Sequence, residues 1–416
     1  MSLGAFRIRS FRFQFSSDLL TSWAFEMETV ILGWYVMTNT GSVLWLTAFG
    51  SLQFLGTLAA PIFGVLGDRV GGRTMLCAMR TAYSALAASL MLLAFTGRLS
   101  PAWVLAIGTL AGLVRPNDLV MRNTLIGETI PVPNRLGALA MSRATSDSAR
   151  VGGALAGASL STVLGIGLTY VFVTLFYVVS LALTFGVSRR MPVPGPGAAA
   201  PPLSVPAASG WGELKAGLLR VARAPELLAM MLLAFLINLT AYPVSGGLLP
   251  YAAQRVYHVE ATGLGLLVAS FALGGLLASI MMVVTGGPRH AERATLLGTA
   301  VWYALLLGFG HLETMTAGLI TLFLAGFVQN VAMIAMTAVL LAAAGEGFRG
   351  RVMGVRMLAV YGLPLGLIGA GFLIDRIGYP ATITISAALG LVCTGLIGLR
   401  WRASMWRRVP AAETWG

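Results

Sequence analysis

The sequence predicts an all-α polytopic membrane protein whose twelve spanning helices form two six-helix bundles. The chain has 416 residues, of which 57% are apolar and 10% are charged, and its mean hydropathy is +0.83. A soluble globular domain does not have this composition. Apolar runs of about 20 residues recur along nearly the whole chain, and each is long enough as a helix to cross about 30 Å of hydrocarbon. Because the runs are continuous rather than alternating, they favour helices over a β-barrel.

Twelve such runs divide evenly between the two parts of the chain. The first six spans are predicted at residues 16–38, 43–66, 75–96, 102–125, 140–164 and 167–187. The second six are predicted at residues 226–250, 261–285, 294–312, 315–343, 353–374 and 380–400.

A linker rich in Pro, Gly and Ser separates the two sets of spans, at residues 188–210. Such a composition does not form a packed element. Residues 211–223 then alternate leucines with basic residues at helical spacing, which indicates an amphipathic helix lying on the membrane surface. The predicted domains are therefore an N-terminal bundle (1–187), a cytoplasmic linker with its helix (188–223) and a C-terminal bundle (224–416).

Basic residues determine the predicted orientation. The formal charge is +13, and nearly all of the positive charge is arginine, since Lys215 is the one lysine. The arginines cluster in alternate connections between spans and near both termini, which is the positive-inside pattern and not that of a nucleic-acid-binding protein. We therefore expect both termini in the cytoplasm, with lipids and no nucleic acid as partners. Cys77 and Cys393 fall inside apolar runs and are expected to be packing residues.

The connection between the second and third spans, GVLGDRVGGRT, carries opposite charges within a glycine-rich turn. Its residues match the signature G-x-x-x-D-R-x-G-R-R/K, except that a glycine replaces a usual basic residue at position 72. With six plus six spans about a central linker, this motif resembles that of the major facilitator superfamily. The matching residues are Gly64, Asp68, Arg69, Gly71 and Arg73.

Three further stretches resemble one branch of that superfamily, the transmembrane secretion effector group that includes enterobactin exporters. They are GWYVMTNTGS, RNTLIGETIPVPNRLGALAMSRATSDSARVGGALAG and FRGRVMGVRMLAVYGLPLGLIGAGFLIDRIG. The resemblance implies a monomeric secondary transporter in a bacterial inner membrane. It would work by alternating access and export a small drug-like or siderophore-like molecule in exchange for protons. Uptake, or lipid transport, by the same fold is the alternative.

The resemblance also implies a role for the motif as a cytoplasmic gate. Its acidic residue, Asp68, would face the start of helix 11 near residues 350–353, where the helix dipole favours a negative charge. Arg69 and Arg73 would meet an acidic group at the inner end of helix 4, for which Glu128 is the best placed. Gly72 in place of a basic residue predicts a weaker latch.

Charged residues within spans are costly, so each is a candidate for function that faces the bundle interior. The first span carries Glu26 and Glu28, about 200° apart around the helix, so that the two are not expected to face the same cavity. Either would exchange protons as the cavity changes sides, or would form a permanent ion pair that stabilises packing. Asp18, nearer the end of the span, is expected to be an interfacial cap or anchor.

Helices 4 and 5 offer basic partners. Arg115 and Asp118 stand three residues apart on one face, and we expect Arg115 to pair with Glu26 or Glu28 rather than with Asp118 alone. Arg122, near the end of helix 4, is expected to be structural. Helix 5 begins with a ladder of charges at spacings of four and three, followed by a G-x-x-x-G pair that permits close helix packing. These residues are Arg143, Asp147 and Arg150, then Gly153 and Gly157.

The C-terminal half has no acidic residue deep within a span, and its polar candidates for the substrate cavity are Asn238, Gln329 and Asn330. Hydrogen bonding between helices is the alternative role for such residues. The histidines lie in predicted loops with no partner spacing, and no catalytic, nucleotide-binding or metal-ligand motif occurs. We therefore expect no enzyme activity, cofactor or metal, with transport driven by a gradient. A membrane-embedded enzyme or sensor is a remote alternative.

Overall fold

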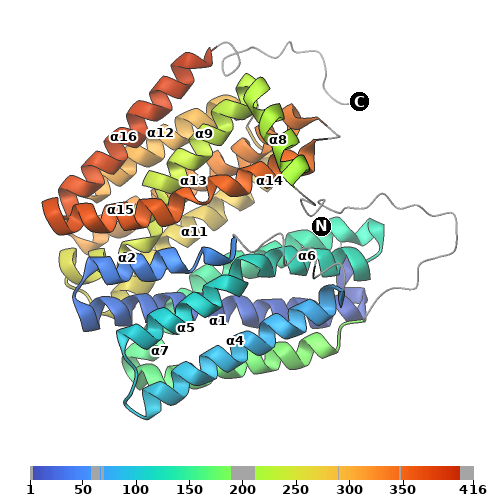
Figure 1. Ribbon diagram of the computed structural model, residues 1–416, viewed down its shortest axis with the longest axis vertical. Helices are drawn as coiled ribbons and strands as arrows, with labels where there is room; N and C mark the ends of the chain where they lie inside the picture. Colours follow the sequence, from blue (N-terminus) through green and yellow to red (C-terminus); the bar gives the residue numbers. More distant parts are fainter. Residues whose placement is uncertain are drawn as a thin grey trace, which may run out of the picture.

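Two groups of helices lie side by side in the computed structural model, which describes residues 3–57, 66, 70–188, 211–288, 290–345 and 348–402 (Figure 1). Secondary structure in these ranges is entirely helical. Of the described helices, eight are long and apolar enough to cross a membrane by length and composition. Apolar side chains that face outward, such as Leu92 and Val284, cover the surface expected to contact lipid.

In the described residues, the N-terminal group comprises six α-helices and three short 3-10 helices, the first of which is η1 (Leu3–Arg7). The others are α1 (Arg9–Thr40), α2 (Val43–Leu52), η2 (Leu55–Thr57), α4 (Gly72–Phe95), α5 (Pro101–Val114), η3 (Arg115–Asn117), α6 (Asp118–Thr129) and α7 (Val132–Phe185). Two of the predicted spans merge in α7, which is broken at Gly165 (φ 77°, ψ 169°). That conformation is open to glycine and strained for other residues, so the glycine allows the chain to reverse between the two spans.

The C-terminal group begins at Trp211. It comprises α8 (Trp211–Arg223), α9 (Pro225–Thr240), η4 (Pro243–Gly247), α10 (Leu249–Tyr251), η5 (Ala252–Val256), α11 (Ala261–Thr285), α12 (Ala291–Phe309), α13 (Met315–Ala344), α14 (Arg349–Ala359), α15 (Gly362–Ile377) and α16 (Tyr379–Arg400). Helices are thus present at all twelve predicted spans, with residues 58–65 of the second span lying outside the described residues. Helix 4 is divided between α5 and α6, and helix 11 between α14 and α15. The predicted linker, residues 189–210, lies outside the described residues.

Residues 211–223 form the expected amphipathic helix, α8, which packs on the N-terminal part of α14. A Cβ atom added to Gly217 would lie 3.0 Å from Val355 and 3.1 Å from the Arg351 carbonyl, so the two helices approach closely. Leu218 and Leu219 face outward at 44% and 46% exposure. This placement agrees with a helix that lies along a surface of the bundle.

Apolar residues form two large clusters. One lies within the N-terminal helices around Met27, Leu76 and Tyr170. The other, centred on Trp302 and Leu322 of the C-terminal helices, extends to Val30, Val43, Ala154 and Ala158 of the N-terminal group. The close approach of α11 and α13 depends on glycine, because a Cβ on Gly274 or Gly326 would overlap a carbonyl oxygen of the facing helix.

The two groups contact each other mainly toward the end where α1 finishes. Ser51 on α2 donates a hydrogen bond to the Pro364 carbonyl at the start of α15 (3.1 Å), and Arg255 donates to the Gly41 carbonyl (3.4 Å). Toward the opposite end, where α1 and α14 begin, the helices of the two groups diverge (Figure 1). The structure is therefore closed at the first of these two ends.

Two glycines make similarly close contacts, but we expect their replacement by a larger residue to have different effects. A Cβ on Gly371 would lie 2.3 Å from Thr47 across the two groups, whereas Gly326 meets Phe271 within one group. We expect Gly326→Val to lower the apparent melting temperature in detergent, since overpacking costs about 1–3 kcal/mol. Gly371→Val should instead open the closed end, measured as a longer distance between spin labels on α2 and α15.

Gly369→Val is the matched control, because no atom lies within 4 Å of a Cβ at that position. An unchanged label distance in Gly371→Val would contradict the role of this contact in holding the groups together.

Candidate functional site

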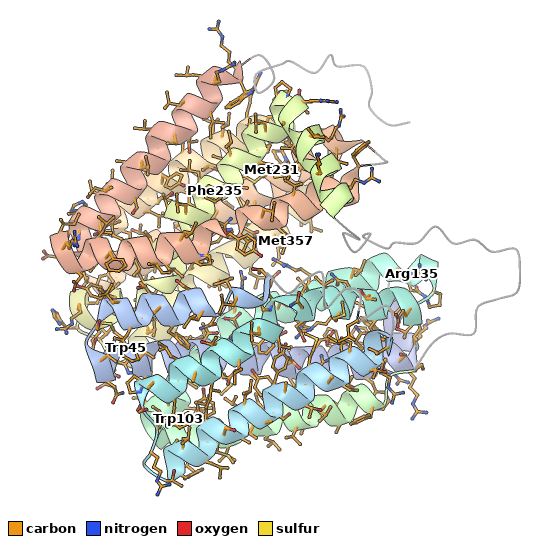
Figure 2. The ribbon with its side chains drawn as sticks, viewed as in Figure 1. Trp45, Trp103, Arg135, Met231, Phe235 and Met357 are labelled. Carbon is orange, nitrogen blue, oxygen red and sulfur yellow. The ribbon has the colours of Figure 1, made fainter. Side chains whose placement is uncertain are left out.

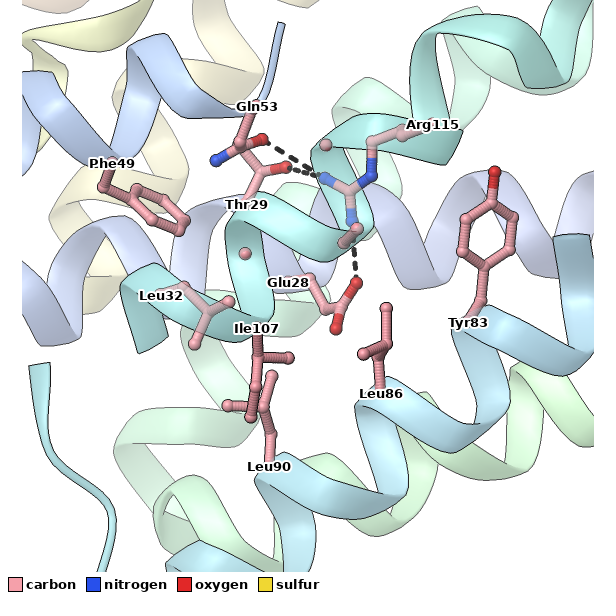
Figure 3. Close-up of a pocket in the computed structure, with 13 residues that line it drawn as sticks. Glu28, Thr29, Leu32, Phe49, Gln53, Tyr83, Leu86, Leu90, Ile107 and Arg115 are labelled. Carbon is pink, nitrogen blue, oxygen red and sulfur yellow. Dashed lines mark hydrogen bonds and ion pairs between the residues drawn. The ribbon is translucent and has the colours of Figure 1, made fainter. Parts of the chain in front are cut away.

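A proline places one arginine of the fourth predicted span beside the first. Pro116 lacks a backbone N–H, and α5 gives way to a 3-10 turn at Arg115–Asn117 before α6 begins. Arg115 at this break donates to the Glu28 carboxylate of α1 at 2.7 Å (Figure 3). The pair expected between Arg115 and a carboxylate of the first span is thus present, and Asp118 lies elsewhere.

Four other groups hold this ion pair. The Tyr177 hydroxyl of α7 donates to the same Glu28 oxygen at 2.7 Å, so one carboxylate oxygen accepts two hydrogen bonds. Arg115 also donates to Thr29 Oγ1 at 3.2 Å and to Gln53 Oε1 at 3.3 Å, and it lies 4.4 Å from the centre of the Phe25 ring. A guanidinium with so many partners is held in one orientation.

The ion pair borders a small cavity of about 20 Å³ between α1, α2, α4 and α5 (Figure 3). Apolar side chains form most of its wall, and its polar lining residues are Glu28, Thr29, Gln53, Tyr83 and Arg115. Glu28 is 6% exposed, so its carboxylate lies inside the N-terminal group and not at its surface.

Glu26 points away from this cavity, toward α7. Its carboxylate lies 3.8 Å from the guanidinium of Arg150, and the two side chains are 27% and 57% exposed. A Cβ on Gly153 would lie 3.0 Å from the Cβ of Glu26, so the small residue permits the approach. The two glutamates, expected to face different directions, therefore have different surroundings: Glu28 is enclosed and Glu26 is accessible.

The charged ladder at the start of the fifth predicted span divides between two partners. Arg143 lies 3.6 Å from Asp147 on the same helix, while Arg150 reaches across to Glu26 on α1. Gly157 completes the predicted close packing, since a Cβ there would lie 2.7 Å from the Met27 Cα atom. The phenol of Tyr242, on the C-terminal side, lies within electrostatic range of both arginines of the ladder.

A second charged cluster lies deeper in the N-terminal group. Asp18 is 1% exposed and accepts from Arg80 at 2.5 Å, with Arg122 at 3.5 Å. Arg122 also forms an ion pair with Asp118, one turn earlier on α6. The expectation that Asp18 is an interfacial cap is therefore wrong, because α1 begins at Arg9 and carries Asp18 more than two turns into the helix.

Hydroxyl groups add further hydrogen bonds to this cluster. Arg80 Nε donates to Thr21 at 3.1 Å and to Ser180 at 2.7 Å, and Arg122 donates to Ser22 at 2.8 Å. Ser17 bonds to Ser180 as well, at 2.8 Å. This site was missed from the sequence; the signal that could have found it is a pair of arginines within spans, Arg80 in the third and Arg122 in the fourth, which each require a buried partner.

The polar residues of the C-terminal half have separate roles. Gln329 donates to the Tyr242 hydroxyl at 2.8 Å, which links α13 to the residues after α9. Asn330 donates to Ser279 at 2.7 Å and to a carbonyl of α11, so it joins two helices of one group. Asn238 donates to the Ala234 carbonyl of its own helix at 2.9 Å. Gln329 is the one of the three that meets a residue near the other group.

Only part of the predicted gate lies within the described residues, since Gly64, Asp68 and Arg69 fall outside them. Gly71 caps α4 with a φ of 83°, a conformation that glycine supplies without strain. The Gly72 amide donates to Glu128 at 3.4 Å, where a helix N-terminus favours a carboxylate. Arg73 donates to the Phe185 carbonyl at 2.5 Å and not to Glu128 as expected, because it faces the end of α7.

Among the residues that the structure describes, no group of three or more His, Cys, Asp or Glu side chains is placed to hold a metal ion. The charged side chains instead form pairs and networks between helices.

These features define a polytopic membrane protein with buried and accessible ion pairs in one half. The chain belongs to the Major Facilitator Superfamily, whose family model matches residues 15–363. It is accordingly a secondary transporter by fold, and not an enzyme. No curated protein sequence matches the chain.

Several solved structures share the fold at low sequence identity. A bacterial homologue of the human lysosomal transporter Spinster, in an inward-facing and unoccupied conformation, is 15% identical, covers 96% of this chain and 98% of its own, and has a TM-score of 0.70. The nucleoside transporter NupG is 12% identical, with 96% and 100% coverage and a TM-score of 0.69. The human organic anion transporter MFSD10 is 19% identical, with 94% and 99% coverage and a TM-score of 0.63. Substrates so different show that the fold alone does not specify what is carried.

The buried cluster should be essential for stability. Asp18→Asn would leave Arg80 and Arg122 to share Asp118, and removing one partner of a buried pair costs about 3–5 kcal/mol. We expect the apparent melting temperature in detergent to fall by several degrees. Asp375→Asn, at an exposed carboxylate of α15, is the control and should leave it unchanged. Equal melting temperatures for the two variants would contradict a structural role for Asp18.

Proposed function

We propose that this chain is a monomeric, proton-coupled transporter of a bacterial inner membrane that exports a small amphipathic molecule of drug-like or siderophore-like character. The branch that the sequence resembles suggests the export direction. The observation that carries the proton coupling is the loose, accessible ion pair between Glu26 and Arg150, which joins two helices of the N-terminal group.

The geometry of this pair favours an exchangeable proton. At 3.8 Å and with both side chains partly exposed, Glu26 and Arg150 are within reach of solvent, unlike the enclosed pair of Glu28 and Arg115. Arg150 and Arg115 are the charged groups that act on Glu26. Protonation of Glu26 would remove the attraction that holds Arg150 to α1 and so loosen α7 from it.

In exchange transport, proton and substrate bind alternately. A substrate that binds beside ionised Glu26 would be released when the carboxylate takes up a proton from the outer side. The apparent affinity for substrate should therefore be lower at pH 6 than at pH 8, since protonation at low pH opposes binding.

Uptake is the second candidate, and the same pair supports it for one class of substrate. An anionic substrate would compete with Glu26 for Arg150, so that protonation of Glu26 would strengthen binding of the anion. Proton and substrate would then move in the same direction, and the apparent affinity would rise as the pH falls. The sign of the pH effect on affinity separates the two candidates.

Replacing both glutamates tests the coupling. We expect Glu26→Gln/Glu28→Gln to abolish accumulation of substrate against a gradient in proteoliposomes, because neither side chain then titrates. The measurement is the flux of a fluorescent amphipathic compound chosen because it stabilises the purified protein. Glu26→Gln alone should have the same effect at a nearly unchanged melting temperature. If the double variant still transports against the gradient, coupling through the first span is wrong.

The gate is a further part of the proposal. We propose that the motif from Gly64 to Arg73, with Glu128, latches the end of the bundle where α14 begins and breaks when the two halves rock. The hydrogen bond from the Gly72 amide to Glu128 supports close packing of the N-terminus of α4 on α6.

A charge-neutral substitution tests the latch. Asp68→Asn removes the negative charge that would favour the N-terminus of α14, an interaction typically of 0.3–1 kcal/mol, about a two- to fivefold change in the balance of states. Distances between spin labels on α4 and α14 should shift toward the open state. A distribution identical to that of the unmodified protein would contradict the latch.

A further inference from the structure

Three arginines lie near the boundary between the two halves. Among the described residues, only two carboxylates form ion pairs with them. Arg143 and Arg150 project from α7 and Arg356 from α14. All three lie within electrostatic range of the phenol of Tyr242, although they belong to different halves. Met357, next to Arg356, lies at the boundary between the halves in Figure 2.

The positive charge of this region is incompletely neutralised. Arg143 and Arg150 have one carboxylate each, at 3.6 Å and 3.8 Å. Arg356 donates a hydrogen bond to the Thr337 hydroxyl at 2.9 Å, and among the described residues no carboxylate lies within ion-pair distance of it. Three guanidiniums thus face two carboxylates.

Two buried arginines of the same chain show the surroundings that are typical of an arginine with a structural role. Arg80 and Arg122 are 1% and 2% exposed, contact Asp18 or Asp118 directly, and donate to several hydroxyls. Arg143 and Arg150 are instead 58% and 57% exposed and contact their carboxylates loosely. Because a charge within a span is costly, an arginine with only a hydroxyl partner, such as Arg356, indicates a functional role.

We infer that Arg356, together with Arg150 and Arg143, forms a recognition site for the anionic group of the transported molecule. Arginine binds carboxylates, sulfonates and phosphates through paired N–H donors, and its guanidinium also packs on aromatic groups. Tyr242 and Gln329 lie beside the arginines and offer a hydroxyl and an amide for further hydrogen bonds. The substrate class is therefore a small organic anion with an apolar body. This inference rests on the proposed transport function and, because an anion would compete with Glu26 for Arg150, it favours the second candidate, uptake, over export.

Three probes that share a naphthyl body separate charge from apolar binding. They are 1-naphthylacetate, the neutral 1-naphthylacetamide and the cationic 1-naphthylmethylamine, each added to the purified full chain at constant ionic strength and pH 7.5. We expect naphthylacetate to raise the apparent melting temperature at the lowest concentration, because binding to the folded state stabilises it. If the amide or the amine stabilises the protein equally well, or naphthylacetate does not stabilise it at millimolar concentration, the inference is wrong.

Substitutions test the residues. Arg356→Gln and Arg150→Gln should each raise the concentration of naphthylacetate required by at least about tenfold, as for loss of a charge-assisted hydrogen bond. Arg356→Lys should lose less, since it keeps the charge, and Arg98→Gln, at an exposed arginine of a loop, should change nothing. An unchanged preference for the anion in both glutamine variants would overturn the assignment.

Flux measurements distinguish a failure of the anion-recognition site from a failure of the proposed transport function. Gradient-driven flux of the amine or amide in proteoliposomes, with no flux of naphthylacetate, would overturn anion recognition and leave the transport function standing. Arginine-dependent binding of naphthylacetate without flux of any probe would support the recognition site and contradict the proposed function.

Discussion

The need to neutralise charge inside an apolar bundle organises the N-terminal half of this protein. Asp18 meets Arg80 of α4 and Arg122 of α6, and Asp118 shares Arg122. Two carboxylates and two guanidiniums are thereby buried with balanced charge, and Arg80 and Arg122 also donate to hydroxyls of α7 and α1. A cluster of this kind stabilises the fold only when every member is present, since an unpaired buried charge costs several kcal/mol.

This cluster also determines how α1 is rotated, and the rotation decides the surroundings of its two glutamates. With Asp18 directed toward α4 and α6, Glu28 lies nearly three turns further along in the interior, beside Arg115 and Tyr177. Glu26 then faces α7 and Arg150. The enclosed pair resembles the structural cluster in its short contacts, whereas the accessible pair differs in distance and exposure. The contrast is the physical basis for assigning exchange of protons to Glu26.

Close packing holds the two halves together at one end of the molecule. Small residues on α7, α11 and α15 let the helices approach, as at Gly265, where a Cβ would lie 2.5 Å from Ala158. At the other end the helices diverge. Arg143 and Arg150 of α7 and Arg356 of α14 lie within electrostatic range of Tyr242. Charge that is unneutralised at this boundary is available to a ligand, whereas the charge in the buried cluster is not.

The sequence by itself determined the helical class, the twelve spans, the amphipathic helix and the family, because hydropathy and spacing along a helix are local properties. It also identified a carboxylate of the first span as the partner of Arg115, and the glycines that bring α7 against α1. Only the tertiary structure decided that Asp18 is buried, that Asp118 pairs with Arg122, that Arg73 bonds to the end of α7, and which glutamate is enclosed. Spacing gives the angle between two residues of one helix, but the direction in which the helix faces depends on contacts with distant segments. Arg80 and Asp18, for example, are 62 residues apart.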